Sequence, residues 1–199
     1  MSERYFTAIL PPPAVAEELA GVVRQLAALP DAERLRWTER DGWHITLAYY
    51  GQISDPDRLA ELGDRLAATA RALQPFALRL AGGESLGEWA LGAGVAGDRT
   101  TLAGLAAATA EDGLALGLPE TAERHPSYRP HLTVARNVRS PRPVAFAPYT
   151  AALAPFTGRE WLAAELVLMR NANADERPGA HTYVPAATWP LGGRAAEGT

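Results

Sequence analysis

Apolar residues recur along the 199-residue chain at two different spacings. A spacing of three or four residues places side chains on one face of a helix, and here it predicts three helices. The first follows the prolines at 11–13 and ends before Pro30. The second begins at Pro56 with Asp55 as its N-cap, and the third begins after Asp98, which could cap it. We expect their buried faces to carry Val15, Leu19, Val22, Val23 and Leu26, then Leu59, Leu62, Leu66 and Leu73, then Leu102, Leu105 and Ala106.

Segments rich in aromatic and β-branched residues lie between and after these helices, and they predict strands. The strands are expected at about residues 5–10, 43–50, 76–80, 89–95, 130–137 and 166–169, with a last one near Tyr183. The order β-α-β-α-β-β-α-β-β-β predicts an α+β fold rather than a doubly wound sheet. We expect a single domain over residues 1–191 and a disordered tail over residues 192–199.

Composition narrows the chemistry. The net charge is −4, so any nucleic-acid substrate would have to be held locally, at an end or a single phosphate. The chain contains no cysteine, which excludes thiol nucleophiles, and no lysine, which excludes Schiff-base and lysine-adenylate chemistry. It has neither a signal-like N-terminus nor an apolar run of membrane-spanning length, so we expect a monomeric cytoplasmic protein without a membrane partner.

A short pattern occurs twice. "HITLA" at residues 44–48 and "HLTVA" at residues 131–135 both read His, apolar, Thr, apolar, Ala, and each lies in a predicted strand. Because side chains alternate along a strand, the histidine and threonine of each copy share one face and the two apolar residues share the other. We therefore expect two pseudo-symmetric lobes, with antiparallel or mixed sheets facing a central cleft, helices on the outer faces, and the two His-Thr pairs opposite each other.

Such an arrangement suits metal-free cleavage of a phosphodiester. Two imidazoles can act as general acid and general base, and hydroxyl groups can bind the phosphoryl oxygens. The candidate acid and base are His44 and His131, and the candidate hydroxyls are those of Thr46 and Thr133. One charged and one neutral imidazole would give a bell-shaped pH profile.

The other two histidines, His125 and His181, lack the pattern and are interpreted as surface or structural residues. Phe6 and Tyr128 could stack on a terminal base, although core packing is the commoner role for such aromatic residues.

Four stretches resemble one family, the bacterial RNA 2',3'-cyclic phosphodiesterases (2'-5' RNA ligases) of the two-histidine phosphoesterase superfamily. "RYFTAIL" resembles the first strand of that family, and "LRWTERDGWHITLAYYG" its Arg-Trp element and first motif. "SYRPHLTVAR" resembles its second motif, and "PGAHTYVPAATWPL" its closing strand. The resemblance covers most of residues 4–191.

The resemblance implies hydrolysis of an RNA terminal 2',3'-cyclic phosphate to a 2'-phosphomonoester, without a cofactor or a metal. His44 would be the proton donor and His131 the proton acceptor, while Thr46, Thr133 and Arg136 would bind the phosphate. Arg136 follows His131 by five positions, so in a regular strand it would point to the opposite face. For it to reach the phosphate, the strand must end or bend. The reverse reaction would be an ATP-independent 2'-5' RNA ligation.

Alternatives remain open from the sequence. Within the same chemistry, the substrate could be a small cyclic nucleotide such as ADP-ribose 1'',2''-cyclic phosphate. The chain could also be a non-catalytic module that binds RNA ends, or His44 and His131 could hold a metal with a carboxylate. "GAGVAG" at residues 92–97 matches the dinucleotide-binding glycine pattern, but the run of parallel β-α units is missing, and we interpret these glycines as helix-opening and turn residues.

Overall fold

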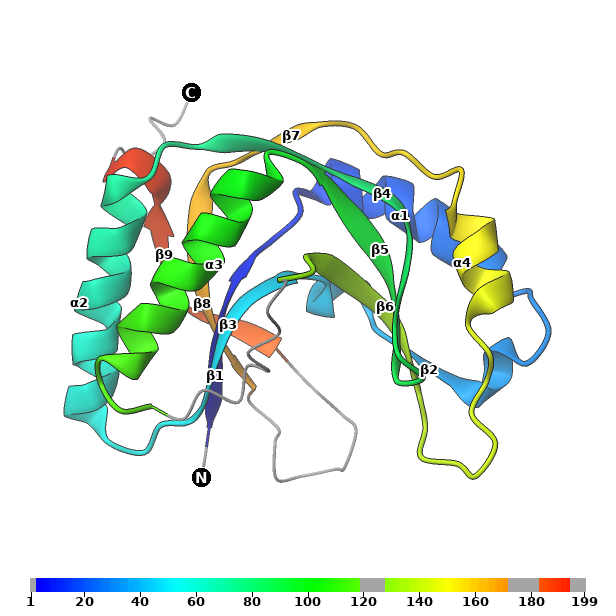
Figure 1. The fold of residues 1–199 in the computed structure, drawn as a ribbon, viewed down its shortest axis with the longest axis horizontal. Coiled ribbons are helices and arrows are strands. Elements are labelled where there is room, and N and C mark those ends of the chain that lie inside the picture. Colours follow the sequence, from blue (N-terminus) through cyan, green and yellow to red (C-terminus); the bar gives the residue numbers. More distant parts are fainter. Residues whose placement is uncertain (1–2, 119–127, 172–182, 194–199) are drawn as a thin grey trace.

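The computed structural model describes residues 3–118, 128–171 and 183–193. In these residues it is an α+β domain with four α-helices and nine strands, shown in Figure 1. The strands are β1 (Arg4–Ile9), β2 (Leu35–Trp37), β3 (Ile45–Gln52), β4 (Phe76–Leu86), β5 (Ala90–Gly97), β6 (His131–Asn137), β7 (Trp161–Ala163), β8 (Glu165–Asn171) and β9 (Tyr183–Pro190). The helices are α1 (Pro13–Leu26), α2 (Pro56–Ala72), α3 (Arg99–Leu114) and α4 (Ala147–Leu153). Short 3-10 turns are η1 (Ala32–Arg34), η2 (Arg40–Gly42) and η3 (Leu191–Gly193).

The three helices predicted from apolar spacing are α1, α2 and α3. Their predicted caps are confirmed, because Asp55 accepts a hydrogen bond from the Asp57 N–H and Asp98 accepts one from the Thr101 N–H. The prediction omitted β2, β7 and the seven-residue α4. His125 and His181 lie outside the described residues, as do residues 194–199 of the predicted tail.

All strands in the described part of the chain belong to one sheet, in which every pairing is antiparallel. The order is β7-β4-β5-β6-β3-β1-β8-β9, with β2 also paired to β6. The sheet has two halves, one built from β1, β3, β8 and β9 and the other from β2 and β4 to β7. The halves meet at one pair of residues, Ile45 on β3 and Leu132 on β6. The two expected lobes are thus continuous through this junction.

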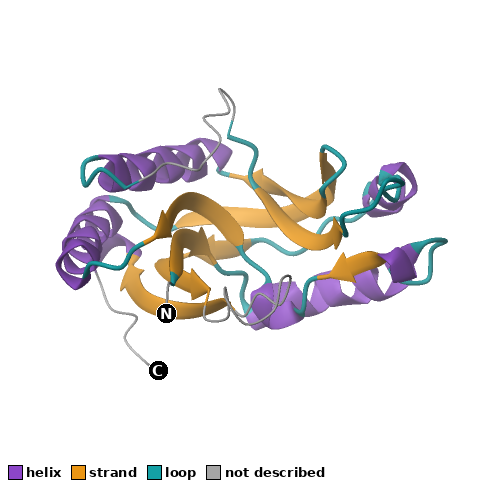
Figure 2. Ribbon diagram, turned by 90° about the horizontal axis from the view of Figure 1, so that it is seen from below, coloured by secondary structure: helices purple, strands orange, loops and turns teal. Residues whose placement is uncertain are grey.

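The helices cover the outer sides of the two halves. In the first half, α3 packs on β3, and α2 packs on β8 and β9. In the second half, α4 packs on β4 and β5 with α1 beside it. Figure 2 shows the strands lying between these helices. The core they enclose includes Ile45 and Leu132, both fully buried. No helix in the described ranges combines the length and apolar character needed to cross a membrane.

The glycines of "GAGVAG" form part of β5 rather than a dinucleotide-binding loop. Only Gly97, with a φ of 98°, makes the expected turn into α3. Gly92 and Gly94 lie in mid-strand, so interpreting them as turn residues was wrong. They are needed for close packing, since a Cβ on Gly92 would lie 2.8 Å from the Leu132 carbonyl oxygen and one on Gly94 would lie 2.6 Å from the Ala81 carbonyl oxygen.

Candidate active site

The residue pair Ile45–Leu132, which joins the two halves of the sheet, also determines which face of the sheet both motifs point to. Ile45 and Leu132 lie directly opposite each other, and both are fully buried on the side of the core. Directly opposite residues of an antiparallel pair point to the same side, and their neighbours along each strand point to the other side. The histidine and threonine that flank Ile45, and those that flank Leu132, therefore share one face of the sheet. All four are only partly buried.

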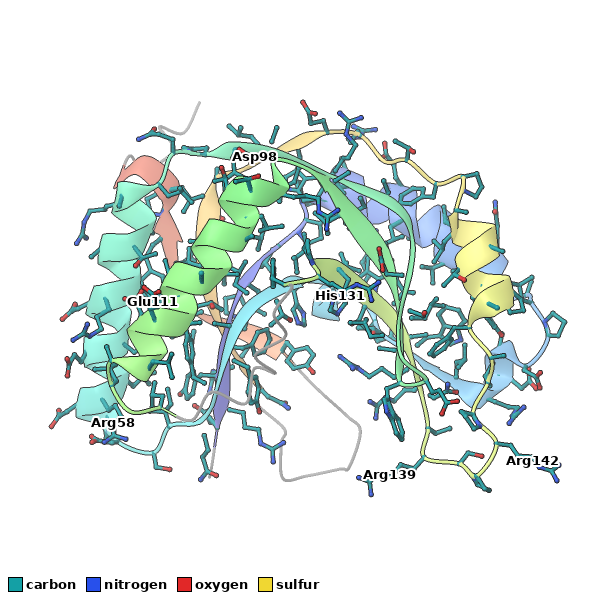
Figure 3. The ribbon with its side chains drawn as sticks, in the orientation of Figure 1. Arg58, Asp98, Glu111, His131, Arg139 and Arg142 are labelled. Carbon is teal, nitrogen blue, oxygen red and sulfur yellow. The ribbon has the colours of Figure 1, made fainter. Side chains whose placement is uncertain are left out.

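The antiparallel pairing of β3 with β6 also sets the histidine of each motif opposite the threonine of the other. Extended by one residue in each direction, it sets His44 opposite Thr133 and Thr46 opposite His131. The two histidines are then diagonal neighbours, whose Cα atoms lie about 7–8 Å apart in a regular ladder. The two rings are close enough for the charge of His131 to contribute to lowering the pKa of His44. Figure 3 places His131 in the middle of the molecule, between the helices of the two halves.

Each imidazole ring is oriented by a hydrogen bond of the same kind, from Nδ1 to the backbone carbonyl oxygen two residues earlier. Nδ1 of His44 lies 2.7 Å from the carbonyl oxygen of Gly42, and Nδ1 of His131 lies 2.9 Å from that of Arg129. A carbonyl oxygen only accepts, so Nδ1 carries the proton in each ring. In both motifs, Nε2 is then the atom that gains or loses a proton, which is the arrangement that general acid–base catalysis requires.

His44 is enclosed by aromatic side chains. Its ring centroid lies 4.8 Å from that of Phe6 and 5.1 Å from that of Tyr183, and Phe6 and Tyr183 also contact each other edge to face. Burial lowers the pKa of His44 to about 4, although the hydrogen bond to the Gly42 carbonyl acts in the opposite direction. Because its ring packs against His44, Phe6 is not available to stack on a base. Nothing in the sequence pattern pointed to Tyr183 as a neighbour of this histidine.

His131 has a more open setting. Its neighbours across the β5–β6 pair are glycines, with Gly94 opposite His131 and Gly92 opposite Thr133. These two glycines contribute no side chain beside the second motif, but the side chain of Glu84 lies close to Gly94, with its Cγ 3.3 Å from where a Cβ on Gly94 would be. Burial lowers the pKa of His131 as well, partly offset by the hydrogen bond to the Arg129 carbonyl. Nearby, Glu84 forms an ion pair with Arg129.

The two threonine hydroxyls are available to a ligand. Neither Thr46 nor Thr133 uses its side-chain hydroxyl in a hydrogen bond with another described residue. Tyr128 donates its own hydroxyl to the backbone carbonyl of Thr46, at 2.8 Å, and so ties the segment before β6 to β3. Tyr128 thus has a structural partner, which favours the packing interpretation over base stacking.

Arg136 returns to the face of the histidines because β6 contains a bulge. In the β5–β6 register, Leu91 pairs with Ala135 and Gly92 pairs with Thr133, so Val134 is an extra residue. Val134 and Ala135 are consecutive and both fully buried, which reverses the alternation. Arg136 therefore does not point to the opposite face, as it would in a regular strand, and the bend required for phosphate contact exists. The positive charge of Arg136 contributes to lowering the pKa of both His44 and His131.

The first motif has the same irregularity. In the β1–β3 register, Thr7 pairs with Ala48 and Ala8 pairs with Thr46, so Leu47 is the extra residue. The residue that returns to the face is then Tyr49, which packs against a small apolar cluster rather than carrying a charge. The repeated unit is therefore six residues long, "HITLAY" and "HLTVAR". Its sixth position could have been found in the sequence, had a bulge been assumed.

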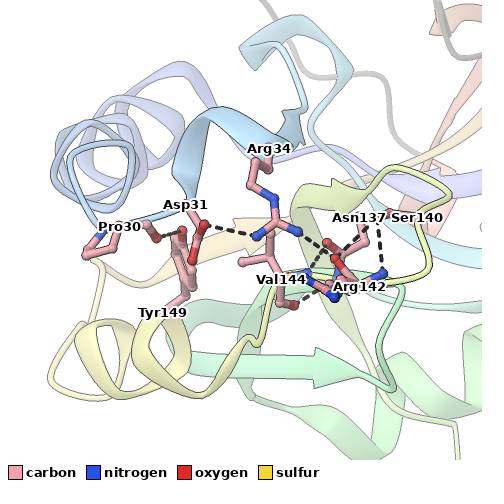
Figure 4. Close-up of polar contacts among 8 residues, drawn as sticks. All are labelled: Pro30, Asp31, Arg34, Asn137, Ser140, Arg142, Val144 and Tyr149. Atoms are coloured by element: carbon pink, nitrogen blue, oxygen red, sulfur yellow. Dashed lines mark hydrogen bonds and ion pairs between the residues drawn. The ribbon is translucent and has the colours of Figure 1, made fainter.

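A network of polar contacts holds the loop that follows Arg136. The side chain of Asn137 donates to the carbonyl oxygens of Glu88 and Val144 and accepts from the Val144 N–H. Arg34 donates to Asp31 and to the carbonyl oxygen of Arg142, as Figure 4 shows. These contacts fix the end of β6 against the chain that leads into β2. Within the described ranges, no group of three or more His, Cys, Asp or Glu side chains is arranged to hold a metal ion.

Comparisons with known proteins show which proteins the chain resembles. The model of the family described as LigT like phosphoesterase matches residues 9–96. The RNA 2',3'-cyclic phosphodiesterase of Geobacillus stearothermophilus is 32% identical over 173 residues, a match that covers 81% of this chain. It covers 51% of the relative, so the chain spans about half the length of that protein.

Solved structures share the fold. E. coli LigT in complex with ATP has a TM-score of 0.66 and 22% identity, covering 96% of this chain and 99% of LigT. The Thermus thermophilus protein TT0787 has a TM-score of 0.69 and 22% identity, covering 96% of this chain and all of TT0787 (100%). The resemblance indicated by the two motifs is thus confirmed: the chain has the fold of LigT and is similar in sequence to the LigT-like phosphoesterases.

Proposed function

We propose that this chain hydrolyses the 2',3'-cyclic phosphate at an RNA 3' end to a 2'-phosphomonoester. The observation that carries the proposal is the crossed arrangement of His44 and Thr133 with Thr46 and His131 on one face of the sheet. It brings two titratable Nε2 atoms and two free hydroxyls around a space that suits one phosphate. The Geobacillus stearothermophilus relative is named for the same activity, which supports the substrate class.

The proposed reaction uses each group once. His131 Nε2 accepts a proton from water, whose oxygen forms a bond to phosphorus. The bond between phosphorus and the 3' oxygen breaks, and His44 Nε2 donates a proton to that oxygen. The products are a 3'-hydroxyl and a 2'-phosphate, and the proton gained by His131 returns to His44 through solvent. Thr46, Thr133 and Arg136 bind the phosphate oxygens, where negative charge is concentrated.

The donor role of His44 depends on the substrate. With its pKa near 4, His44 is neutral at pH 7 in the free protein, and the negative charge of a bound phosphate is needed to raise that pKa. Since the pKa of His131 is also lowered, the singly protonated form that catalysis requires accumulates below pH 6.5. We expect kcat/KM to follow a bell-shaped pH profile with its maximum below pH 6.5. A profile that is flat from pH 5 to pH 9 would contradict two-histidine catalysis.

The same groups would catalyse the reverse reaction, in which a 5'-hydroxyl replaces water and the product is a 2'-5' linkage. This ligation needs no ATP, because the cyclic ester supplies the driving energy. The net charge of −4 favours a small substrate, so ADP-ribose 1'',2''-cyclic phosphate is the second candidate.

The test is turnover of a short RNA that ends in a 2',3'-cyclic phosphate, measured with and without EDTA. We expect a 2'-phosphate product in both conditions, and none from His131→Ala. Loss of turnover in EDTA would contradict the metal-free mechanism. If only ADP-ribose 1'',2''-cyclic phosphate is turned over, that small nucleotide is the substrate in place of RNA. If RNA binds tightly but is not turned over, the chain is a binding module and not an enzyme.

A further inference from the structure

Two arginines lie opposite each other beyond the catalytic motifs. β2 pairs with β6, and the register sets Arg36 directly opposite Arg136. Residues on either side of Arg36 turn to the core, where Leu35 is buried and Trp37 packs against buried residues. Arg36 therefore points to the same face as Arg136, which is the face of the two histidines.

No acidic side chain in the described part of the chain neutralises this pair. Like charges directly opposite in a sheet are destabilising. Neither Arg36 nor Arg136 forms an ion pair or a side-chain hydrogen bond with a described residue, although both side chains are partly buried. Other arginines nearby do have partners: Arg34 binds Asp31, and Arg40 binds Glu17. Two partly buried guanidinium groups that face each other without an anion form a binding position for one from outside the chain.

The pair extends away from the histidines along one edge of β6. The Thr38 N–H donates to the Val134 carbonyl oxygen, after which the chain leaves β6 and returns with His44 next to Ile45. Measured along the strand direction, His44 and Arg36 are separated by about two residues when the extra residue of the β6 bulge is not counted. This corresponds to about 7 Å. This distance is similar to the step from one backbone phosphate to the next in single-stranded RNA.

Electrostatic influence within the site agrees with this placement. The charge of Arg136 acts on His44, on His131 and on the Tyr183 hydroxyl, whereas that of Arg36 acts on Tyr183. Burial still raises the pKa of Tyr183, so its hydroxyl stays protonated. Arg136 is thus close enough to act on both histidines, and Arg36, directly opposite it, is close enough to act on Tyr183.

We propose that Arg36 binds a second phosphate of the substrate and makes the site select for it. A nucleotide with a terminal 2',3'-cyclic phosphate has its other phosphate on its 5' oxygen. The selected substrates are therefore those with a 5'-phosphoryl group, either a phosphomonoester or the next phosphodiester of an oligonucleotide. This inference rests on the proposed hydrolysis of a cyclic phosphate at His44 and His131.

The test compares uridine 2',3'-cyclic phosphate bearing a 5'-phosphate with the same compound bearing a 5'-hydroxyl. Wild type is expected to have the higher kcat/KM for the 5'-phosphorylated compound, and Arg36→Ala is expected to lower the ratio of the two values about tenfold or more. Arg36→Lys, which keeps the charge but not the paired N–H donors, is expected to fall between them. Arg40→Ala removes an exposed arginine from the same segment, and it should leave the ratio unchanged.

Three results separate the possible failures. An equal loss for both compounds, or no change in the ratio, would overturn the role of Arg36. A lower melting temperature in Arg36→Ala would indicate a structural role, because removing one of two like charges should not destabilise the fold. If wild type hydrolyses neither compound, the proposed function fails, and calorimetric titration with the same two compounds tests Arg36 by binding. Equal affinities in wild type would then overturn the second phosphate position.

Discussion

The two motifs have the same pattern, hydrogen bond and bulge, but their surroundings differ. His44 is enclosed by Phe6 and Tyr183, and its pKa falls to about 4. His131 lies beside Gly92 and Gly94, and the side chain of Glu84 lies close to Gly94. The repeated sequence thus supplies two equivalent Nε2 atoms, and the neighbouring strands make them unequal. Unequal environments are what separate an acid from a base when both groups are imidazoles.

The largest expected effect comes from removing either ring. General acid or base catalysis contributes about 10²- to 10⁴-fold, so His44→Ala and His131→Ala should each lower kcat by that amount. Steady-state kinetics on the cyclic-phosphate RNA measures both losses.

The same two variants should differ in their effect on the stability of the fold. His44→Ala leaves a gap between two aromatic rings and should lower the melting temperature, whereas His131→Ala, beside two glycines, should change it little. Equal melting temperatures would show that the aromatic enclosure does not support the fold.

The next effect is the pH dependence of stability. The folded pKa of His44 lies below its unfolded value of 6.5, so the unfolded chain binds more protons between pH 6.5 and about pH 4. Stability should therefore fall as the pH is lowered through this window, by about 3 kcal/mol at most, and His44 should contribute nothing above it. Urea unfolding at pH 7.5 and pH 5 checks this, with His44→Gln as the variant that should lose less stability than wild type between the two values.

A smaller effect is expected from adding a methyl group at Gly92, beside the second motif. In Gly92→Ala, the added Cβ meets the Leu132 carbonyl oxygen at 2.8 Å, so β5 and β6 must separate. Overpacking of this kind costs about 1–3 kcal/mol. The matched control is Gly104→Ala on α3, where a Cβ meets nothing within 4 Å and should stabilise the helix slightly. A Gly92→Ala protein with unchanged melting temperature and kcat would contradict the close approach.

The smallest expected effect is the loss of one hydroxyl. Thr46→Val and Thr133→Val each remove one donor to a charged oxygen while nearly keeping the side-chain volume, and each should lower kcat/KM about tenfold. Because the two threonines occupy crossed positions, the losses should be similar in size. Steady-state kinetics on the cyclic-phosphate RNA measures both, and a loss confined to one variant would show that the halves do not share the phosphate.

Much of the fold could be predicted because the long elements carry strong patterns. The helix stripes, the Asp55 and Asp98 caps and the shared phase of the two motifs all follow from local chemistry. The short β2 and β7 could not be predicted, since three residues are too few to show a period. α4 was hidden in a proline-rich stretch, with only Tyr149 and Leu153 on its buried side.

The parts of the site that sequence reasoning missed depend on pairing between distant strands. The bend that Arg136 requires could be stated from the sequence only as a condition, because a bulge depends on the partner strand as much as on its own sequence. Gly92 and Gly94 matched a known glycine pattern, but their role appears only when β5 is set beside β6. Tyr183 reaches His44 from the far end of the chain, and no local spacing connects the two.

The central claim is that the two motifs form one acid–base pair around a single phosphate. A double-mutant cycle on His44→Ala and His131→Ala tests it most directly, with kcat measured on RNA ending in a 2',3'-cyclic phosphate. If the rings act as a unit, the double variant should be about as slow as the slower single variant. If the two losses multiply in full, or if either single variant keeps wild-type turnover, the two histidines do not act together and the account is wrong.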